Sequence, residues 1–98
     1  MKIQWTHVAY RRLDEIYGYI ENDSPANAEK WVDKLLKKLA TITDFPRAGR
    51  IVPEIEMANI REIVYGNYGI VYKVKDEIVY IMTIRHFKQI LPLSDLDG

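Results

Sequence analysis

The stretch from residue 60 to residue 74, "IREIVYGNYGIVYKV", decides how the second half of the chain folds. Isoleucine, valine and tyrosine, which favour strands, lie on both sides of Gly66-Asn67, a two-residue hairpin signal. If these two residues form the loop, Tyr65 faces Tyr68 across the hairpin. The sequence therefore predicts two antiparallel strands with a defined register.

This register also divides the hairpin side chains between two faces of the sheet. One face carries Arg61, Ile63, Tyr65, Tyr68, Ile70 and Tyr72, and the other carries Glu62, Val64, Gly69, Val71 and Lys73. We expect helices to cover one face only, so the other face stays partly open and carries function. If the open face is the one with the tyrosines, then Tyr65, Tyr68 and Tyr72 can stack a nucleic-acid base.

Two amphipathic helices are expected before the hairpin. Apolar residues recur at helical spacing over residues 9–20 and again over residues 28–42. Thr6 and Ser24 are good N-caps, and Pro25 then occupies the first helical position, where its missing N–H does no harm. The short gap between the helices implies an antiparallel helical hairpin.

Shorter strands complete the predicted elements. Residues 2–5 alternate in polarity as a strand does, and residues 50–55 form a short edge strand broken by Pro53. Another strand spans residues 78–87 and follows a turn of two or three residues. Because these two turn lengths place Arg85 on opposite faces of the sheet, its orientation stays open at this point.

The predicted fold is a single α+β domain over residues 1–98. It has an N-terminal strand, an antiparallel helical hairpin, and an antiparallel β-meander of three to four strands with the helices on one face.

Hydrophobic residues make up 48% of the chain and charged residues 29%, as in ordinary globular proteins. No apolar run approaches the roughly 18–20 residues of a membrane span, and the N-terminal residues do not form an export signal. The chain has no cysteine, which excludes disulfides and a thiol nucleophile and fits the cytoplasm.

The charge balance limits the nucleic-acid roles that this chain can have. The net charge is zero, whereas proteins that bind nucleic acid usually carry excess positive charge, so such a role needs a local basic patch. Basic residues do gather after residue 46: Arg47, Arg50, Arg61, Arg85 and Lys88. Acidic residues offset them: Glu54, Glu56, Asp95 and Asp97. A solvated surface explains this pattern equally well.

The two histidines differ in what their positions suggest. His7 falls in the first turn of the first helix, which suits a surface or capping role. His86 ends the last strand beside Arg85 and shortly before Lys88, and a histidine among cations suits acid–base work on an anionic substrate. The alternative for His86 is a polar residue at a strand end. Two distant histidines with no carboxylate at ligand spacing predict no metal site, and no cofactor motif is present.

Four strings in the chain, in this order, resemble the RelE/ParE superfamily of bacterial and archaeal toxins, which includes plasmid stabilisation proteins. They are "DSPANAEKWVDKL" (residues 23–35), "FPRAGRIVPE" (45–54), "IREIVYGNYGIVYKV" (60–74) and "VYIMTIRHFKQ" (79–89). The resemblance covers about residues 2–91. It implies the toxin of a type II toxin–antitoxin pair, held inactive by a cognate antitoxin segment that wraps along the helices and sheet. A homodimer or a heterotetramer with the antitoxin is compatible with it, without membrane or cofactor.

The resemblance implies one of two targets. ParE-like members poison DNA gyrase and need no nuclease site, whereas RelE-like members act with the translating ribosome as endoribonucleases that cut mRNA. In the second case Arg61 would stabilise the phosphate and His86 would act as the acid or base. Arg50, Arg85, Lys88 and Tyr68 would bind the substrate. The long helical hairpin and the "GR" at residues 49–50 look more like the ParE side.

Gly69 departs from the family pattern. Glycine within a strand lowers the stability of the fold by roughly 0.5–1 kcal/mol relative to alanine, so a structural or functional reason for Gly69 is expected. The family hairpin usually reads Tyr-Arg-Ile/Leu-Val-Tyr, whereas this chain reads YGIVY at residues 68–72. The resemblance implies that the missing arginine points at the scissile phosphate in nuclease members. We therefore interpret Gly69 as a lost functional side chain rather than a backbone requirement.

Three functions follow from the sequence and the resemblance. The first is a growth-inhibiting toxin that poisons DNA gyrase. The second is a ribosome-dependent endoribonuclease, attenuated because Gly69 replaces the usual arginine. The third is a toxin fold without activity that binds an antitoxin and co-represses its operon.

Overall fold

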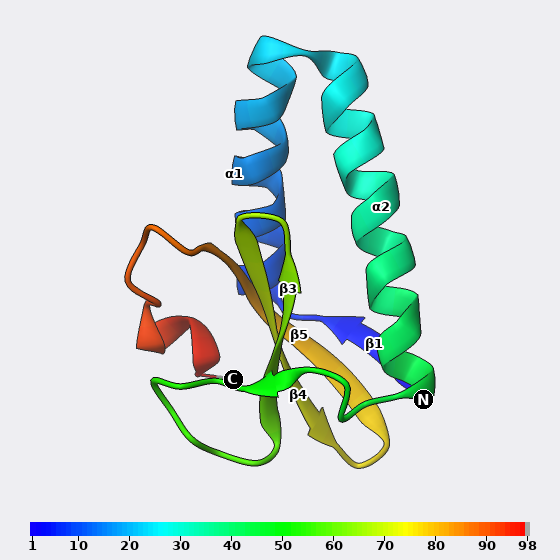
Figure 1. Cartoon of the computed structure of the whole chain (residues 1–98), viewed down its shortest axis with the longest axis vertical. Coiled ribbons are helices and arrows are strands. Elements are labelled where there is room, and N and C mark those ends of the chain that lie inside the picture. The colour runs from blue at the N-terminus through cyan, green and yellow to red at the C-terminus, as the bar shows by residue number, and fades with distance from the viewer. Residues whose placement is uncertain (98) are drawn as a thin grey trace.

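The computed structural model describes residues 1–97 and confirms the predicted α+β fold. The elements are β1 (Lys2–Trp5), α1 (His7–Asp23), α2 (Pro25–Asp44), β2 (Arg50–Ile51), β3 (Ile60–Tyr65), β4 (Tyr68–Lys75), β5 (Ile78–His86) and the 3₁₀ helix η1 (Leu93–Leu96). Figure 1 shows the two helices as an antiparallel hairpin whose tip extends beyond the sheet. Within residues 1–97, neither helix is both long and apolar enough to cross a lipid bilayer.

The predicted caps set the start of both helices. The Thr6 hydroxyl accepts a hydrogen bond from the N–H of Ala9 (3.1 Å) and donates to the carbonyl of Ile81 (3.0 Å), which ties the start of α1 to β5. Ser24 ends α1 and also begins α2, because its hydroxyl accepts from the N–H of Asn27 (3.2 Å). Pro25 follows as the first residue of α2. The turn between the helices is therefore as short as the sequence predicts.

The five strands form one mixed sheet in the order β1-β5-β4-β3-β2. The register of the β3–β4 hairpin is the predicted one, with Tyr65 opposite Tyr68 and Arg61 opposite Tyr72. The sequence did not reveal that β1 pairs with β5, and in parallel. The helical hairpin therefore connects the two edge strands of the sheet, β1 and β2, and packs on one face.

The β4–β5 turn decides where Arg85 lies. Asp76 and Glu77 form a two-residue turn with φ of 52° and 61°, the left-handed region that a tight hairpin turn requires. A register shift between Val71 and Tyr72 adds an irregularity to the same pair of strands. Together they place Arg85 opposite Gly69, on the face of the sheet away from the helices.

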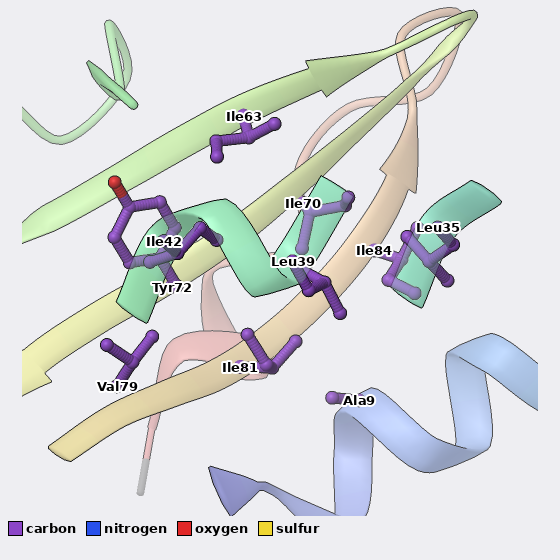
Figure 2. Close-up of a cluster of buried hydrophobic side chains, with 10 residues drawn as sticks. All are labelled: Ala9, Leu35, Leu39, Ile42, Ile63, Ile70, Tyr72, Val79, Ile81 and Ile84. Carbon is purple, nitrogen blue, oxygen red and sulfur yellow. The ribbon is translucent and has the colours of Figure 1, made fainter. Parts of the chain in front are cut away.

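The main core lies between the helices and the tyrosine-bearing face. Its buried side chains, shown in Figure 2, are Ala9, Leu35, Leu39, Ile42, Ile63, Ile70, Tyr72, Val79, Ile81 and Ile84. Tyr72 is fully buried, and its hydroxyl donates to the carbonyl of Pro46 (2.7 Å) and accepts from the N–H of Gly49 (2.9 Å). The Tyr65 hydroxyl donates to the carbonyl of Trp31 in α2 (2.7 Å). The expectation that these tyrosines stack a base is therefore wrong for Tyr65 and Tyr72, because helices cover their face.

The opposite face of the sheet is not open either. A second apolar cluster covers part of it, formed by Val52, Ile60, Val71 and Leu91 with Ile55 and Leu96 packed against them. Ile60 and Val71 belong to β3 and β4, and the loop after β2 and the C-terminal segment fold over them with the other four residues. The charged side chains of Glu62 and Arg85 are also buried on this face. The expected partly open face is thus largely closed by the chain itself.

Candidate functional site

Glu62 of β3 and Arg85 of β5 form a buried ion pair. Arg85 Nε donates to Glu62 Oε2 (2.7 Å), and Arg85 Nη2 donates to Oε1 (3.0 Å). The side chain of Glu62 is 0% exposed and that of Arg85 is 7% exposed. Two parallel charge-assisted hydrogen bonds offset part of the cost of burying both charges.

Arg50 of β2 is the second cation at Glu62. Its Nη2 donates to Glu62 Oε1 at 2.8 Å, while about half of its side chain stays exposed. Phe87 lies against both guanidinium groups, with Arg50 Cζ 5.5 Å and Arg85 Cζ 5.4 Å from its ring centroid. The aromatic ring holds both cations in place and excludes water from one side of the pair.

Glu54, in the loop after β2, supplies the second negative charge. Its carboxylate pairs with Nη1 and Nη2 of Arg85. The hydrogen bond from Arg85 lowers the pKa of Glu54, and the hydrogen bonds to Glu62 and Glu54 raise the pKa of Arg85 despite its burial. Two carboxylates and two guanidinium groups therefore form a charge-balanced cluster, which we call the arginine–glutamate cluster: Arg50, Glu54, Glu62 and Arg85.

Gly69 lies beneath this cluster, and the structure corrects our interpretation of it. A Cβ atom at position 69 would overlap Oε2 of Glu62, would lie 2.6 Å from Glu62 Cδ and would lie 3.0 Å from Cζ of Phe87. The space above Gly69 is therefore already occupied by the ion pair and by Phe87. A glycine is needed at position 69 because a larger residue would overlap Glu62, and an arginine here would displace Glu62.

Arg61 is held by backbone groups at the opposite end of the hairpin. Its guanidinium donates to the carbonyls of Gly49 (3.0 Å) and Ala58 (3.2 Å), which fixes the loops on either side of β2. Arg61 pairs with Tyr72, whereas His86 pairs with Tyr68. At about 3.3 Å per strand residue, this places them about 13 Å apart along the strands, with two strand spacings between them.

His86 lies at the end of β5 next to Tyr68. The two rings meet edge to face with centroids 5.1 Å apart. His86 Nδ1 accepts a hydrogen bond from the backbone N–H of Lys88 at 3.0 Å. Because the accepting nitrogen carries no proton, the ring proton of a neutral imidazole lies on Nε2. Burial raises the pKa of the Tyr68 phenol, and nearby Tyr19 adds to this effect. The pair thus offers a phenol and an imidazole nitrogen, Nε2, that has no hydrogen-bond partner among residues 1–97.

This pair lines a pocket of about 400 Å³ between α1, the ends of β4 and β5 and the C-terminal segment. Arg12 of α1 closes one side, because its Nε and Nη2 donate to the two carboxylate oxygens of Asp95 (2.9 and 3.0 Å). Thr83 donates to the same carboxylate at 2.9 Å. Burial would raise the pKa of Asp95, but these hydrogen bonds outweigh it and lower the pKa. Asp95 thereby fastens the C-terminal segment to α1 and β5.

A comparison with known families identifies the chain. A sequence model described as "ParE toxin of type II toxin-antitoxin system, parDE" matches residues 3–91. The chain belongs to this ParE toxin family. The match spans both helices and strands β2 to β5, so the arginine–glutamate cluster and His86 lie within the matched residues.

Two curated proteins are similar to this ParE family chain over most of its length. The putative toxin Y4kP of Sinorhizobium fredii is 34% identical over 93 residues, which are 93% of this chain and 93% of that protein. The toxin RelE2 of Caulobacter vibrioides is 33% identical over 86 residues, which are 87% of this chain and 93% of that protein.

Chains from solved toxin–antitoxin systems share the fold of this ParE family member. A chain of the chromosomal ParDE toxin–antitoxin system from P. aeruginosa superposes with a TM-score of 0.72 at 24% identity, over 88% of this chain and 95% of that one. A chain of the toxin–antitoxin complex RelBE2 from Mycobacterium tuberculosis gives 0.57 at 21% identity, over 87% and 95%. At these identities the likeness concerns the fold.

The structure groups the residues predicted for a ParE or RelE site in three places. Arg50 and Arg85 meet in the arginine–glutamate cluster, Tyr68 and His86 meet at the pocket, and Arg61 lies apart from both. Lys88 is exposed just after β5. Their roles in substrate binding or catalysis stay predictions.

Sequence reasoning missed the partners of these residues. Glu62 was assigned to the correct face of the sheet. On that face its neighbours in the strand are the apolar residues Ile60 and Val64, and a glutamate in such surroundings is a signal that a cation pairs with it. Glu54 and Phe87 carried no such signal. Asp95 was counted as a surface charge, although it is 4% exposed.

Proposed function

We propose that this chain is a growth-inhibiting toxin that poisons DNA gyrase through protein–protein contacts and that a cognate antitoxin neutralises it. Membership of the ParE family and the fold shared with a ParDE system support this proposal. A gyrase poison needs a surface that fits the enzyme and no nuclease site of its own.

The single observation that carries the choice of gyrase is the separation of Arg61 from His86. An endoribonuclease site requires a phosphate-stabilising cation within reach of the same substrate as the acid or base. Arg61 lies about 13 Å from His86 along the strands, and it donates to the carbonyls of Gly49 and Ala58 instead. The two groups are therefore poorly placed to act on one phosphodiester.

The charge balance supports the same choice. Glu62 and Glu54 already neutralise Arg50 and Arg85, the two arginines that meet at Glu62. An RNA strand gains most of its affinity from cations that its phosphates can reach. A protein target makes no such demand, because apolar contacts and hydrogen bonds supply most of its affinity.

An antitoxin partner agrees with the exposed apolar side chains beside the pocket. Tyr19 of α1 is 77% exposed, and Ile90 and Leu93 of the C-terminal segment are 93% and 60% exposed. Both similar solved structures come from toxin–antitoxin systems. A partner segment that covers these side chains would gain from their burial, at about 25 cal/mol per Å².

Ribosome-dependent mRNA cleavage is the second candidate. It is favoured by the His86–Tyr68 pair, which places an imidazole and a phenol on one pocket, and by the similarity to the toxin RelE2 of Caulobacter vibrioides. In this candidate His86 would act as the acid or base and Lys88 would contact the RNA backbone.

Pulse labelling after induction without antitoxin separates these candidates. Incorporation of labelled thymidine and labelled methionine is followed over the first minutes. The proposal expects thymidine incorporation to fall first while methionine incorporation continues. An earlier fall in methionine incorporation would contradict the proposal and favour mRNA cleavage. If neither falls while the chain is folded and abundant, the chain is an antitoxin-binding module without toxicity.

A further inference from the structure

The arginine–glutamate cluster contains a second carboxylate, that of Glu54, in addition to the Glu62 carboxylate that orients Arg85. Glu62 alone fixes the Arg85 guanidinium through Nε and Nη2 (2.7 and 3.0 Å). Glu54 pairs with the remaining side of the same guanidinium, through Nη1 and Nη2. Since one buried glutamate faces two arginines, Glu54 supplies the negative charge that balances the second cation.

We propose that Arg50 and Arg85 form a binding site for a glutamate or aspartate side chain of a protein partner, and that Glu54 occupies this site in the free chain. The partner's carboxylate replaces that of Glu54, whose side chain turns into solvent while the packing of Val52 and Ile55 keeps the loop in place. This choice of a protein partner rests on the proposed function, whereas the carboxylate site itself rests on the geometry alone.

The two arginines are fixed in place before any ligand arrives. Arg85 is 7% exposed, is fastened by Glu62, and lies 5.4 Å from the ring centroid of Phe87. Arg50 is held by the same glutamate at 2.8 Å and by the other contact with Phe87. A fork of N–H donors that is already ordered loses little side-chain entropy when it binds a carboxylate, and this favours affinity.

Glu54 is the exchangeable member of the cluster. Its side chain is 42% exposed, whereas that of Glu62 is 0% exposed. Glu54 also lies outside the strands, in the loop between β2 and β3. The Glu54 side chain can therefore turn into solvent without disturbing the sheet, whereas Glu62 is enclosed.

The surroundings of Glu54 favour a peptide ligand over a nucleic acid. In the sequence Val-Pro-Glu-Ile, the flanking Val52 and Ile55 pack in the second apolar cluster while Glu54 pairs with Arg85. The site thus already binds a glutamate between aliphatic residues. Exposed Val64 and Phe87 on the same face extend the apolar surface. A phosphate backbone would meet this apolar surface and the charge of buried Glu62.

The internal carboxylate competes with any external one. A tethered competitor has an effective concentration of about millimolar or more, so it lowers the apparent affinity for an external ligand. Removing the charge of Glu54 therefore raises the affinity. Glu54→Gln is the test variant, and Glu56→Gln is the matched control, because Glu56 lies in the same loop, is exposed and makes no ion pair with residues 1–97.

The probe is the acetylated and amidated peptide Ile-Val-Pro-Glu-Ile, with Ile-Val-Pro-Gln-Ile as its uncharged counterpart. Binding to the ¹⁵N-labelled full chain is followed by NMR at the Nε–Hε group of Arg85. We expect a saturable shift in the Glu54→Gln variant at a concentration at least tenfold lower than in the wild type or the Glu56→Gln control. We also expect the glutamine peptide to bind the variant at least fivefold more weakly.

Three results would overturn the proposal. If the glutamate peptide shifts Arg85 equally in all three chains, Glu54 does not block the site. If the Glu54→Gln variant keeps a folded spectrum and shows no saturable shift, no carboxylate site exists. A decauridylate probe that binds the variant at lower concentration than the peptide would show a phosphate site, and the protein partner would be wrong. These measurements use purified protein, so their failure is distinct from a failure to affect gyrase.

Discussion

Gly69 and Glu62 share one space on the face of the sheet away from the helices. A Cβ atom at position 69 would lie 2.6 Å from Cδ of Glu62, which is closer than real Cβ atoms approach. Glu62 cannot yield easily, because its carboxylate binds Arg85 and Arg50. The bare backbone at Gly69 is therefore part of the buried ion pair.

This relationship predicts that any side chain at position 69 destabilises the protein. We expect Gly69→Ala to lower the free energy of unfolding by about 1–3 kcal/mol through overpacking, and Gly69→Arg to lower it further. Gly18→Ala is the control, because nothing lies within 4 Å of a Cβ there and alanine stabilises a helix interior by about 0.8–1 kcal/mol. Urea unfolding measures both. A Gly69→Arg chain as stable as the wild type would contradict this packing role.

Removing Glu62 should be among the most damaging single changes on the sheet. Glu62→Ala leaves Arg85 buried without its main partner, and breaking a buried pair in this way costs about 3–5 kcal/mol. Glu15→Ala removes an exposed ion pair with Arg12, which is worth at most about 1 kcal/mol. Thermal unfolding of the two variants should separate them clearly, and similar losses would show that the Glu62 pair is not effectively buried.

The contribution of Asp95 to stability should depend on pH. Its pKa is lowered in the folded chain, so the unfolded chain, with a pKa near 3.9, binds the proton more readily. The stabilisation is therefore fully present above about pH 4–5 and is lost as the pH falls through the lower folded pKa. We expect Asp95→Asn to be less stable than the wild type by about 1–3 kcal/mol at pH 7, with the difference shrinking below about pH 4. Urea midpoints at pH 7, 5 and 3 measure it, and a constant difference would argue against this role.

The turn between β4 and β5 offers a stabilising substitution. Glu77 has a φ of 61°, a conformation that costs an L-residue about 1–2 kcal/mol and that glycine adopts freely. After the greater chain entropy of glycine is subtracted, we expect Glu77→Gly to stabilise the protein by about 0.5–1 kcal/mol. Asp76→Gly should gain less, because aspartate tolerates this region better. Loss of stability in Glu77→Gly would mean that the side chain makes a contact that outweighs the turn.

Local sequence signals predicted the helices and the first hairpin, whereas the Glu62–Arg85 pair depends on the register of strands that are distant in the sequence. The caps Thr6 and Ser24 and the Gly66-Asn67 loop act within a few residues, so the helices and the first hairpin followed from the sequence. The Glu62–Arg85 pair depends on a turn at Asp76 that lacks the usual glycine and on the shift beside Val71. Neither feature is visible in the pattern of residue types.

Gly69 shows that contacts between distant residues also limited the prediction of function from the sequence. Its neighbours in the sequence are ordinary strand residues, and a family pattern suggested a missing arginine. The reason for the glycine lies seven positions earlier, in Glu62, and across the sheet in Arg85. Contacts between Arg12 and Asp95, which are 83 positions apart, were out of reach for the same reason.

The central claim is that this chain acts on gyrase through protein contacts, and purified components test it most directly. The chain is incubated with DNA gyrase, ATP and supercoiled plasmid, and the reaction is stopped with detergent and protease. The account predicts that linear plasmid accumulates in proportion to the toxin and disappears when the cognate antitoxin is added first. Intact plasmid at every toxin concentration, together with mRNA cut in the A site of purified translating ribosomes, would contradict it.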